Sequence, residues 1–139
     1  MRITGLLIAF MALSLFVLPG LTAQTFSTPH TSESRAIRLT ERDGSSLVYT
    51  SDTGYTEELA EFAKDADLLL LECSFRRDKP LQTHLELADA MRLAHLAQAK
   101  RVVLTHLYPE WDEVDLAFEA RQLWSGETIP VTDGLRLQF

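Results

Sequence analysis

The chain has 139 residues, 46% of them hydrophobic and 24% charged, and its formal net charge is −7. This length and balance predict one modest globular domain with its own core and exclude wholesale disorder. The negative charge argues against a broad nucleic-acid-binding surface, since phosphate backbones require clustered Lys and Arg. The single cysteine, Cys73, excludes an intramolecular disulfide and a cysteine-rich zinc motif. We expect it to be a small buried apolar side chain at a strand end.

The amino terminus supports two interpretations. Arg2, the apolar run over residues 5–18 and the small-residue end near Ala23 are typical of a signal peptide. The run is too short for a stable membrane span. Alternatively, residues 1–20 are an apolar segment of a domain core, packed as a helix or strand and ended by a turn at Pro19-Gly20.

Alternation of apolar and polar residues predicts three strands in the first half, over residues 21–26, 35–40 and 46–50. Asp43-Gly44, between the last two, is a hairpin signal. The apolar period then changes to that of a helix, which is expected to begin after the N-cap Thr56 and to end near residue 66. The apolar run 68–71 follows as a strand buried on both faces.

The second half alternates helices and strands. After a polar loop over residues 73–82, Thr83 and Glu86 form a capping box, which predicts a helix from Thr83 to about residue 99. A short buried strand is expected at 102–105, and Asp112 is placed to cap a helix that ends near Trp124. Two short strands, at 128–131 and 135–139, complete an α/β pattern, a β-meander followed by alternating α and β in a single domain.

Side chains with catalytic or metal-binding chemistry follow several of these strands. Asp52 comes directly after one strand, His106 directly after another, and His30 lies in a turn after the first. His84 begins the next predicted helix. Because sites in open α/β sheets are built at the carboxyl ends of the strands, we expect these side chains to lie together. Each has a structural alternative when taken alone: an Asx-turn or helix cap for Asp52, and a packing or surface role for the histidines.

The combination of residue types indicates a metal site. Two imidazoles and one carboxylate, from His30, His106 and Asp52, form a ligand set suited to zinc or manganese. His84 is the candidate general acid, placed to protonate a leaving oxygen. The fourth histidine, His95, falls within a predicted helix and is expected to be structural or solvent-facing.

The order of these motifs resembles the carboxyl-terminal half of a metallo-β-lactamase-fold hydrolase, in particular the ribonuclease Z and small phosphodiesterase branches. The resemblance covers residues 21–139 and implies half of an αββα sandwich as a half-domain that follows the apolar segment 1–20. It rests on Thr-Pro-His-Thr at 28–31, Leu-Val-Tyr-Thr-Ser-Asp-Thr-Gly at 47–54, Asp-Leu-Leu-Leu-Leu-Glu-Cys-Ser-Phe at 67–75, Thr-His-Leu at 83–85, Val-Leu-Thr-His at 103–106 and Asp-Gly-Leu at 133–135.

The resemblance also implies roles for individual residues. His30 would belong to one metal ion and His106 to the other, with Asp52 bridging the two. His84 matches the histidine that assists the leaving group near the phosphate.

Further implications concern the surroundings of the ligands and the reaction. Glu72 and Thr53 would support the site from behind its ligands. Two zinc ions, with manganese as an alternative, would lower the pKa of a bridging water, and the implied reaction is phosphodiester hydrolysis by metal-bound hydroxide.

One departure from the family pattern changes these expectations: the sequence contains no His-x-His-x-Asp-His motif, which supplies most of both coordination spheres in the family. We therefore expect a truncated half-site that is inactive alone and is completed by an amino-terminal half or a homo-oligomer. The expected substrate is a small-molecule or nucleotide phosphodiester. The alternative is a non-catalytic, secreted binding or scaffolding module derived from the same fold. The expected location is cytoplasmic, with export through a segment ending near Ala23 as the alternative.

Overall fold

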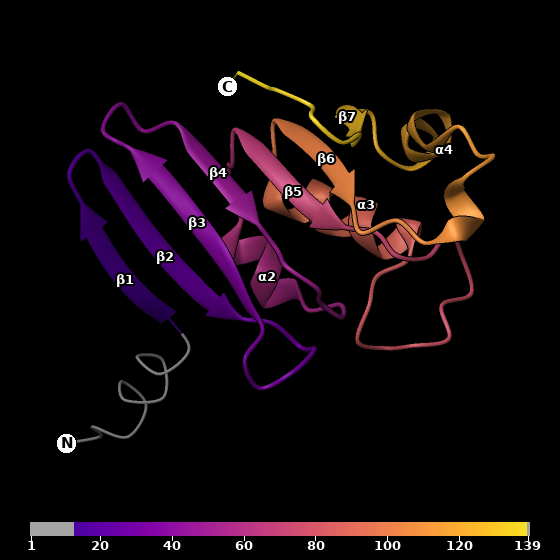
Figure 1. Cartoon of the computed structure of the whole chain (residues 1–139), viewed down its shortest axis with the longest axis horizontal. Coiled ribbons are helices and arrows are strands. Elements are labelled where there is room, and N and C mark those ends of the chain that lie inside the picture. The colour runs from indigo at the N-terminus through magenta and orange to yellow at the C-terminus, as the bar shows by residue number, and fades with distance from the viewer. Residues whose placement is uncertain (1–12, 139) are drawn as a thin grey trace.

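The computed structural model describes residues 13–138, which form a seven-stranded sheet with helices against it (Figure 1). The strands lie in the sheet in the order in which they occur in the chain. They are β1 Leu13–Leu18, β2 Leu21–Ser27, β3 Arg35–Glu41, β4 Ser46–Tyr49, β5 Leu68–Glu72, β6 Arg101–Thr105 and β7 Glu127–Pro130. The pairs from β1 to β4 are antiparallel and the pairs from β4 to β7 are parallel, which confirms the predicted α/β arrangement of a meander followed by alternation.

Between residues 13 and 138, three α-helices pack on one face of this sheet. They are α2 Glu57–Phe62, α3 Leu87–Ala97 and α4 Leu116–Leu123, and a 3₁₀ turn spans Pro109–Trp111. α3 contacts α2, α4 and β5, so the helices form one layer. Arg38 of β3 binds this layer by donating to the backbone carbonyls of Phe62 and Lys64. Alternate strand residues such as Leu69 and Leu71 are fully buried in the core beneath the helices. Burial on this face accounts for the apolar run of β5, because each leucine removed from water contributes about 2 kcal/mol.

The opposite face of the sheet is also apolar. Leu47, Leu70 and Val103 alternate with the core residues along β4, β5 and β6. The carboxyl-terminal residues 131–135 and 137 line, together with these side chains, a hollow of about 410 Å³. The last segment of the described chain therefore covers part of this second face.

The helix predicted from Thr83 begins later than expected. α3 starts at Leu87, no side chain caps it, and the predicted capping box is wrong. The carboxylate of Glu86 accepts instead from the backbone amide of Lys79 at 3.1 Å. Residue 86 also bridges to Phe75, and the amide of Leu87 donates to the Phe75 carbonyl at 3.0 Å. These bonds keep the segment before the helix extended, so His84 lies in a loop.

Two further boundaries differ from the expectations. Asp115, not Asp112, caps α4 by accepting from the amide of Phe118 at 2.8 Å, because the chain first completes the 3₁₀ turn. No strand forms over residues 135–138, although the expected turn before them is present, closed by the Leu135 amide on the Thr132 carbonyl at 3.0 Å. Leu135 instead helps to line the hollow on the second face.

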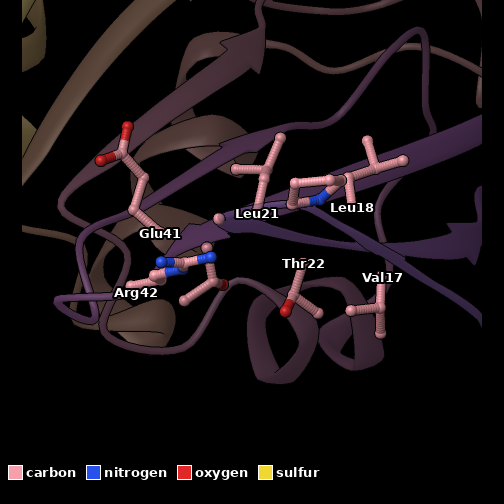
Figure 2. Close-up of a pocket in the computed structure, with 9 residues that line it drawn as sticks. Val17, Leu18, Leu21, Thr22, Glu41 and Arg42 are labelled. Atoms are coloured by element: carbon pink, nitrogen blue, oxygen red, sulfur yellow. The ribbon is translucent and has the colours of Figure 1, made fainter.

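The described part of the apolar amino-terminal segment belongs to the sheet. Residues 13–18 are β1, and Pro19-Gly20 makes the turn into β2, with Gly20 at a φ of +83°. A hollow of about 250 Å³ lies at this end of the hairpin. Figure 2 shows Val17, Leu18 and Arg42 among the residues that line it. The export prediction falls mainly on residues 1–12, outside the described part. Between residues 13 and 138, no helix combines the length and apolar content that a bilayer crossing requires.

Candidate metal centre

Five of the described strands run in the same direction, and four of them carry candidate site residues at one edge of the sheet. β2 is followed by His30, β4 by Asp52 and β6 by His106, while β5 ends at Glu72. The antiparallel pairs before β4 and the parallel pairs after it bring these four ends to the same edge.

Asp52 lies between two histidines. Its Oδ2 is 3.8 Å from Nε2 of His30, and its Oδ1 is 3.5 Å from Nδ1 of His106. The backbone carbonyl of Asp52 accepts from the Thr28 hydroxyl at 3.1 Å, which ties this loop to the turn that carries His30. The carboxylate thus presents one oxygen to each of two imidazoles that come from different strands.

His84 completes the cluster from the loop between β5 and α3. Its ring centroid is 4.7 Å from that of His30 and 5.3 Å from that of His106. One ligand atom each from Asp52, His84 and His106 lies within 4.8 Å of the other two. This triplet differs from the sequence-predicted set of His30, Asp52 and His106, since the loop brings His84 into ligand range as well.

Glu72 lies buried beneath these side chains, with a relative exposure of 1%. Its Oε1 is 2.5 Å from Nδ1 of His84 and accepts from the Thr53 amide at 3.3 Å. Its Oε2 accepts from the amides of Leu85 and Ser74 at 2.9 and 3.2 Å. A carboxylate removed from water requires this many donors, and the same donors fix the position of His84. Thr53 contributes through its backbone amide, while its hydroxyl donates to the Gly54 carbonyl at 2.7 Å.

Ser74 and Tyr108 are site residues that the sequence reasoning did not identify. The Ser74 hydroxyl lies 2.9 Å from Nδ1 of His106 and 3.2 Å from Nδ1 of His84. The Tyr108 ring centroid is 5.4 Å from that of His106 and 6.0 Å from that of His84, so it forms one wall. The Glu-x-Ser spacing at a strand end could have indicated Ser74, because alternate residues of an extended chain point to the same side.

Backbone geometry at the site is unusual in two places. Ser51, just before Asp52, and His106 itself both have a φ of +57°, in the left-handed region that side chains disfavour. Such conformations persist where the surroundings impose them, and they often mark functional positions. Gly54 is constrained in another way, because a side chain there would lie too close to neighbouring backbone atoms. A Cβ there would lie 2.2 Å from the Gln82 carbonyl oxygen and 3.0 Å from that of Pro29.

Comparison with known proteins places the fold and the site in a family. A family profile described as "Beta-lactamase superfamily domain" matches residues 7–107, most of the chain. The chain belongs to the metallo-β-lactamase-fold family. The resemblance inferred from the motifs is thereby confirmed, and the sheet with its single helical layer is half of the family's sandwich.

Three relatives of this metallo-β-lactamase-fold chain, two bacterial and one archaeal, illustrate the similarity. The uncharacterized protein ML1173 of Mycobacterium leprae is 35% identical over 123 residues, which are 87% of this chain and 41% of the relative. The probable metallo-hydrolase YhfI of Bacillus subtilis is 39% identical over 95 residues, or 66% of this chain and 38% of YhfI. The ribonuclease Z of Haloferax volcanii is 34% identical over 103 residues, or 70% of this chain and 32% of that enzyme.

The crystal structure of YhfI from Bacillus subtilis superposes on the chain with a TM-score of 0.79 at 30% identity. The match covers 88% of this chain and 51% of YhfI. The metallo-β-lactamase-fold chain therefore spans about half of that solved structure and about two fifths of the M. leprae relative.

The family implies a divalent metal ion, and the residues present fit one. Imidazole nitrogens and a carboxylate oxygen, grouped within 4.8 Å, are donors that zinc and manganese accept. Glu72 and Ser74 hold two of the imidazoles from behind, as the residues that support metal ligands commonly do.

Cys73 and His95 lie outside this chemistry. Cys73 is fully buried, and burial together with the neighbouring Glu72 charge raises the pKa of its thiol far above the ordinary value. A thiol in this state is a poor nucleophile, in agreement with its expected packing role. His95 is exposed in the last turn of α3, near the helix end and not in its middle.

Proposed function

We propose that this chain carries part of the active site of a metal-dependent hydrolase that cleaves phosphodiesters. The observation that supports this most directly is the Asp52 carboxylate, which directs one oxygen toward His30 and the other toward His106. A carboxylate placed in this way can bridge two ions, each of which takes one of the two histidines.

In this proposal His30 and Asp52 belong to one zinc ion, and Asp52 and His106 to the other, with manganese as an alternative. When bound, the ions would activate a water molecule and neutralise charge on the phosphoryl oxygens. Thr28 and Thr53 keep the Asp52 loop in place through bonds to its backbone and to Glu72.

His84 is proposed as the general acid. Its Nδ1 is held by Glu72 at 2.5 Å, so its Nε2 is the nitrogen that can give a proton to the leaving oxygen. The buried carboxylate also fixes the orientation of the imidazole ring. The ring lies within 5.3 Å, centroid to centroid, of the His106 ring, close to where the scissile bond would be held.

The relatives support the substrate class. Ribonuclease Z is the name of one relative, and a metallo-hydrolase is another. The net charge of −7 favours a small-molecule or nucleotide phosphodiester over a long nucleic acid, since long phosphate backbones are bound by clustered Lys and Arg.

Metal binding by the full chain is the first test. Calorimetric titration of the metal-free chain with zinc should show weak binding that Asp52→Asn and His106→Ala each reduce at least tenfold. His95→Ala is the matched control, because His95 is exposed and lies outside the cluster. Binding that is unchanged in both site variants would contradict the proposed ligands.

The reaction is tested after the missing ligands are supplied. The chain is mixed with the portion of Bacillus subtilis YhfI that lies outside the matched region, and assembly is checked by size-exclusion chromatography. Zinc-dependent hydrolysis of bis(p-nitrophenyl) phosphate, but not of the monoester, is expected. An assembled complex that binds zinc and hydrolyses no diester would favour the non-catalytic binding module instead.

A further inference from the structure

We infer that Ser74 is a positioning residue that fixes the tautomer of His106 and directs its Nε2 lone pair to the metal site. The inference deepens the proposed function, since it concerns the same site. It rests on the hydrogen bonds among Glu72, Ser74 and the two histidines, which determine where each proton must lie.

Glu72 acts only as an acceptor. Four N–H groups already donate to its two oxygens; they come from Thr53, Ser74, Leu85 and His84. Because all four of these groups donate, both carboxylate oxygens act as acceptors. The Ser74 hydroxyl has a single proton and lies 3.2 Å from Oε2 of Glu72, so that proton is donated to Glu72.

The direction of the next bond follows. With its proton on Glu72, the Ser74 oxygen can only accept, and Nδ1 of His106 lies 2.9 Å away. His106 must therefore carry its proton on Nδ1. Nδ1 of His84 also lies near Ser74, at 3.2 Å, but its proton is directed to Glu72 at 2.5 Å. The Ser74 oxygen therefore accepts from Nδ1 of His106.

His30 reaches the same state through a different partner. Its Nδ1 lies 3.0 Å from the carbonyl of Thr83, which only accepts, so His30 also carries its proton on Nδ1. In these two rings the Nε2 lone pair is then free. A backbone carbonyl secures this state in His30, and the hydroxyl of Ser74 secures it in His106.

Because Ser74 accepts the Nδ1 proton of His106, the oxygens of Asp52 remain available to the metal site. The next acceptor near Nδ1 of His106 is Oδ1 of Asp52 at 3.5 Å, followed by Glu72 at 4.0 Å. Without the hydroxyl, only these more distant oxygens face Nδ1, so the proton is no longer fixed on that nitrogen. Loss of such a supporting contact typically lowers metal affinity about 10- to 100-fold.

The test is ¹⁵N NMR of the histidine rings in the full, metal-free chain at neutral pH. In the wild type, His106 should be protonated on Nδ1, as should His30, which serves as an internal reference. Ser74→Ala should convert His106 to a mixture of tautomers and lower zinc affinity at least tenfold, while His30 keeps its state. Ser74→Thr, which retains a hydroxyl, should restore both, and Ser125→Ala, at an exposed serine, should change neither.

Two results would overturn the inference. The first is a wild-type His106 protonated on Nε2, which needs no variant and is decisive even if Ser74→Ala fails to fold. The second is a folded Ser74→Ala chain with the wild-type tautomer of His106. Because the NMR readout involves neither metal nor substrate, failure of the phosphodiester proposal would appear only in the hydrolysis assay.

Discussion

Nδ1 of His84 lies 2.5 Å from Oε1 of Glu72, although the two residues are separated by a loop and twelve positions of sequence. Both are buried, with exposures of 6% and 1%, so the contact is shielded from water. A buried imidazole–carboxylate pair holds the ring in one orientation and one tautomer. The same carboxylate ties together three segments of chain, through Thr53, Ser74 and Leu85.

Replacement of Glu72 by Gln should destabilise the fold. The amide offers one acceptor oxygen in place of two and directs an NH₂ group at backbone N–H donors, so we expect the free energy of unfolding to fall by about 2–4 kcal/mol. Urea denaturation followed by circular dichroism measures this change. Glu61→Gln, at an exposed position of α2, is the control and should change stability by less than about 0.5 kcal/mol. Equal stabilities for the two variants would show that Glu72 does not hold the site together.

Removal of the His84 ring should affect turnover more than metal content. In the complemented enzyme we expect His84→Ala to lower kcat about 10²- to 10⁴-fold, the usual effect of a lost general acid. Zinc content, measured by atomic absorption on the same samples, should stay near that of the wild type. Parallel loss of zinc and turnover would instead identify His84 as a ligand, in line with its position beside Asp52 and His106.

Gly54→Ala should disturb two loops at once. The new Cβ would meet the carbonyl oxygens of Gln82 and Pro29, which directly precede the segments that carry His84 and His30. We expect a loss of about 1–3 kcal/mol in stability together with weaker zinc binding. Gly44→Ala is the control, since Gly44 has a φ of +93° but no atom within 4 Å of a new Cβ. It should cost about 1 kcal/mol through its backbone alone and leave zinc affinity unchanged.

Asp67 should contribute to stability in a pH-dependent way. Lys100 donates to Oδ1 at 2.6 Å and the Ser46 amide donates to Oδ2 at 2.8 Å, and these bonds lower the pKa of Asp67 below its ordinary value. A lowered pKa in the folded state favours folding above the pKa of the unfolded chain, about 3.9. That contribution is lost as the pH falls through the lower folded value.

We therefore expect Asp67→Asn to be less stable than the wild type by about 1 kcal/mol at pH 7, with the difference shrinking below about pH 4. Denaturation midpoints measured between pH 2 and pH 7 test this. Asp65→Asn is the matched control: Asp65 is exposed, and Asn tolerates its φ of +55°. A constant difference across this range would mean that the Asp67 charge is not involved.

The strand-end residues of the candidate site were predictable, whereas the loop that carries His84 was not. Two-residue periodicity and apolar runs located β4 and β6, and therefore placed Asp52 and His106 at one edge of the sheet. His84 was assigned to a helix because Thr83 and Glu86 match a local capping pattern. The bonds that override that pattern, from Lys79 to Glu86 and between Phe75 and the residues before α3, are tertiary. Local sequence does not encode such competition.

The role of Ser74 has a similar explanation. Its hydroxyl matters because residues 10 and 32 positions away bring imidazole nitrogens to it. A serine of this kind looks like any other serine in a loop. The residues that supply the candidate chemistry were therefore visible in the sequence, as was Glu72 through the family resemblance, whereas Ser74 and Tyr108 became visible only in three dimensions.

The sequential strand order separates the candidate site from the margins of the sheet. Among residues 13–138, β1 and β7 form the two margins, and the candidate site is built on the ends of β2, β4, β5 and β6 inside them. A further strand could therefore pair with either margin without rethreading the chain or changing the pairing of the strands that carry the site.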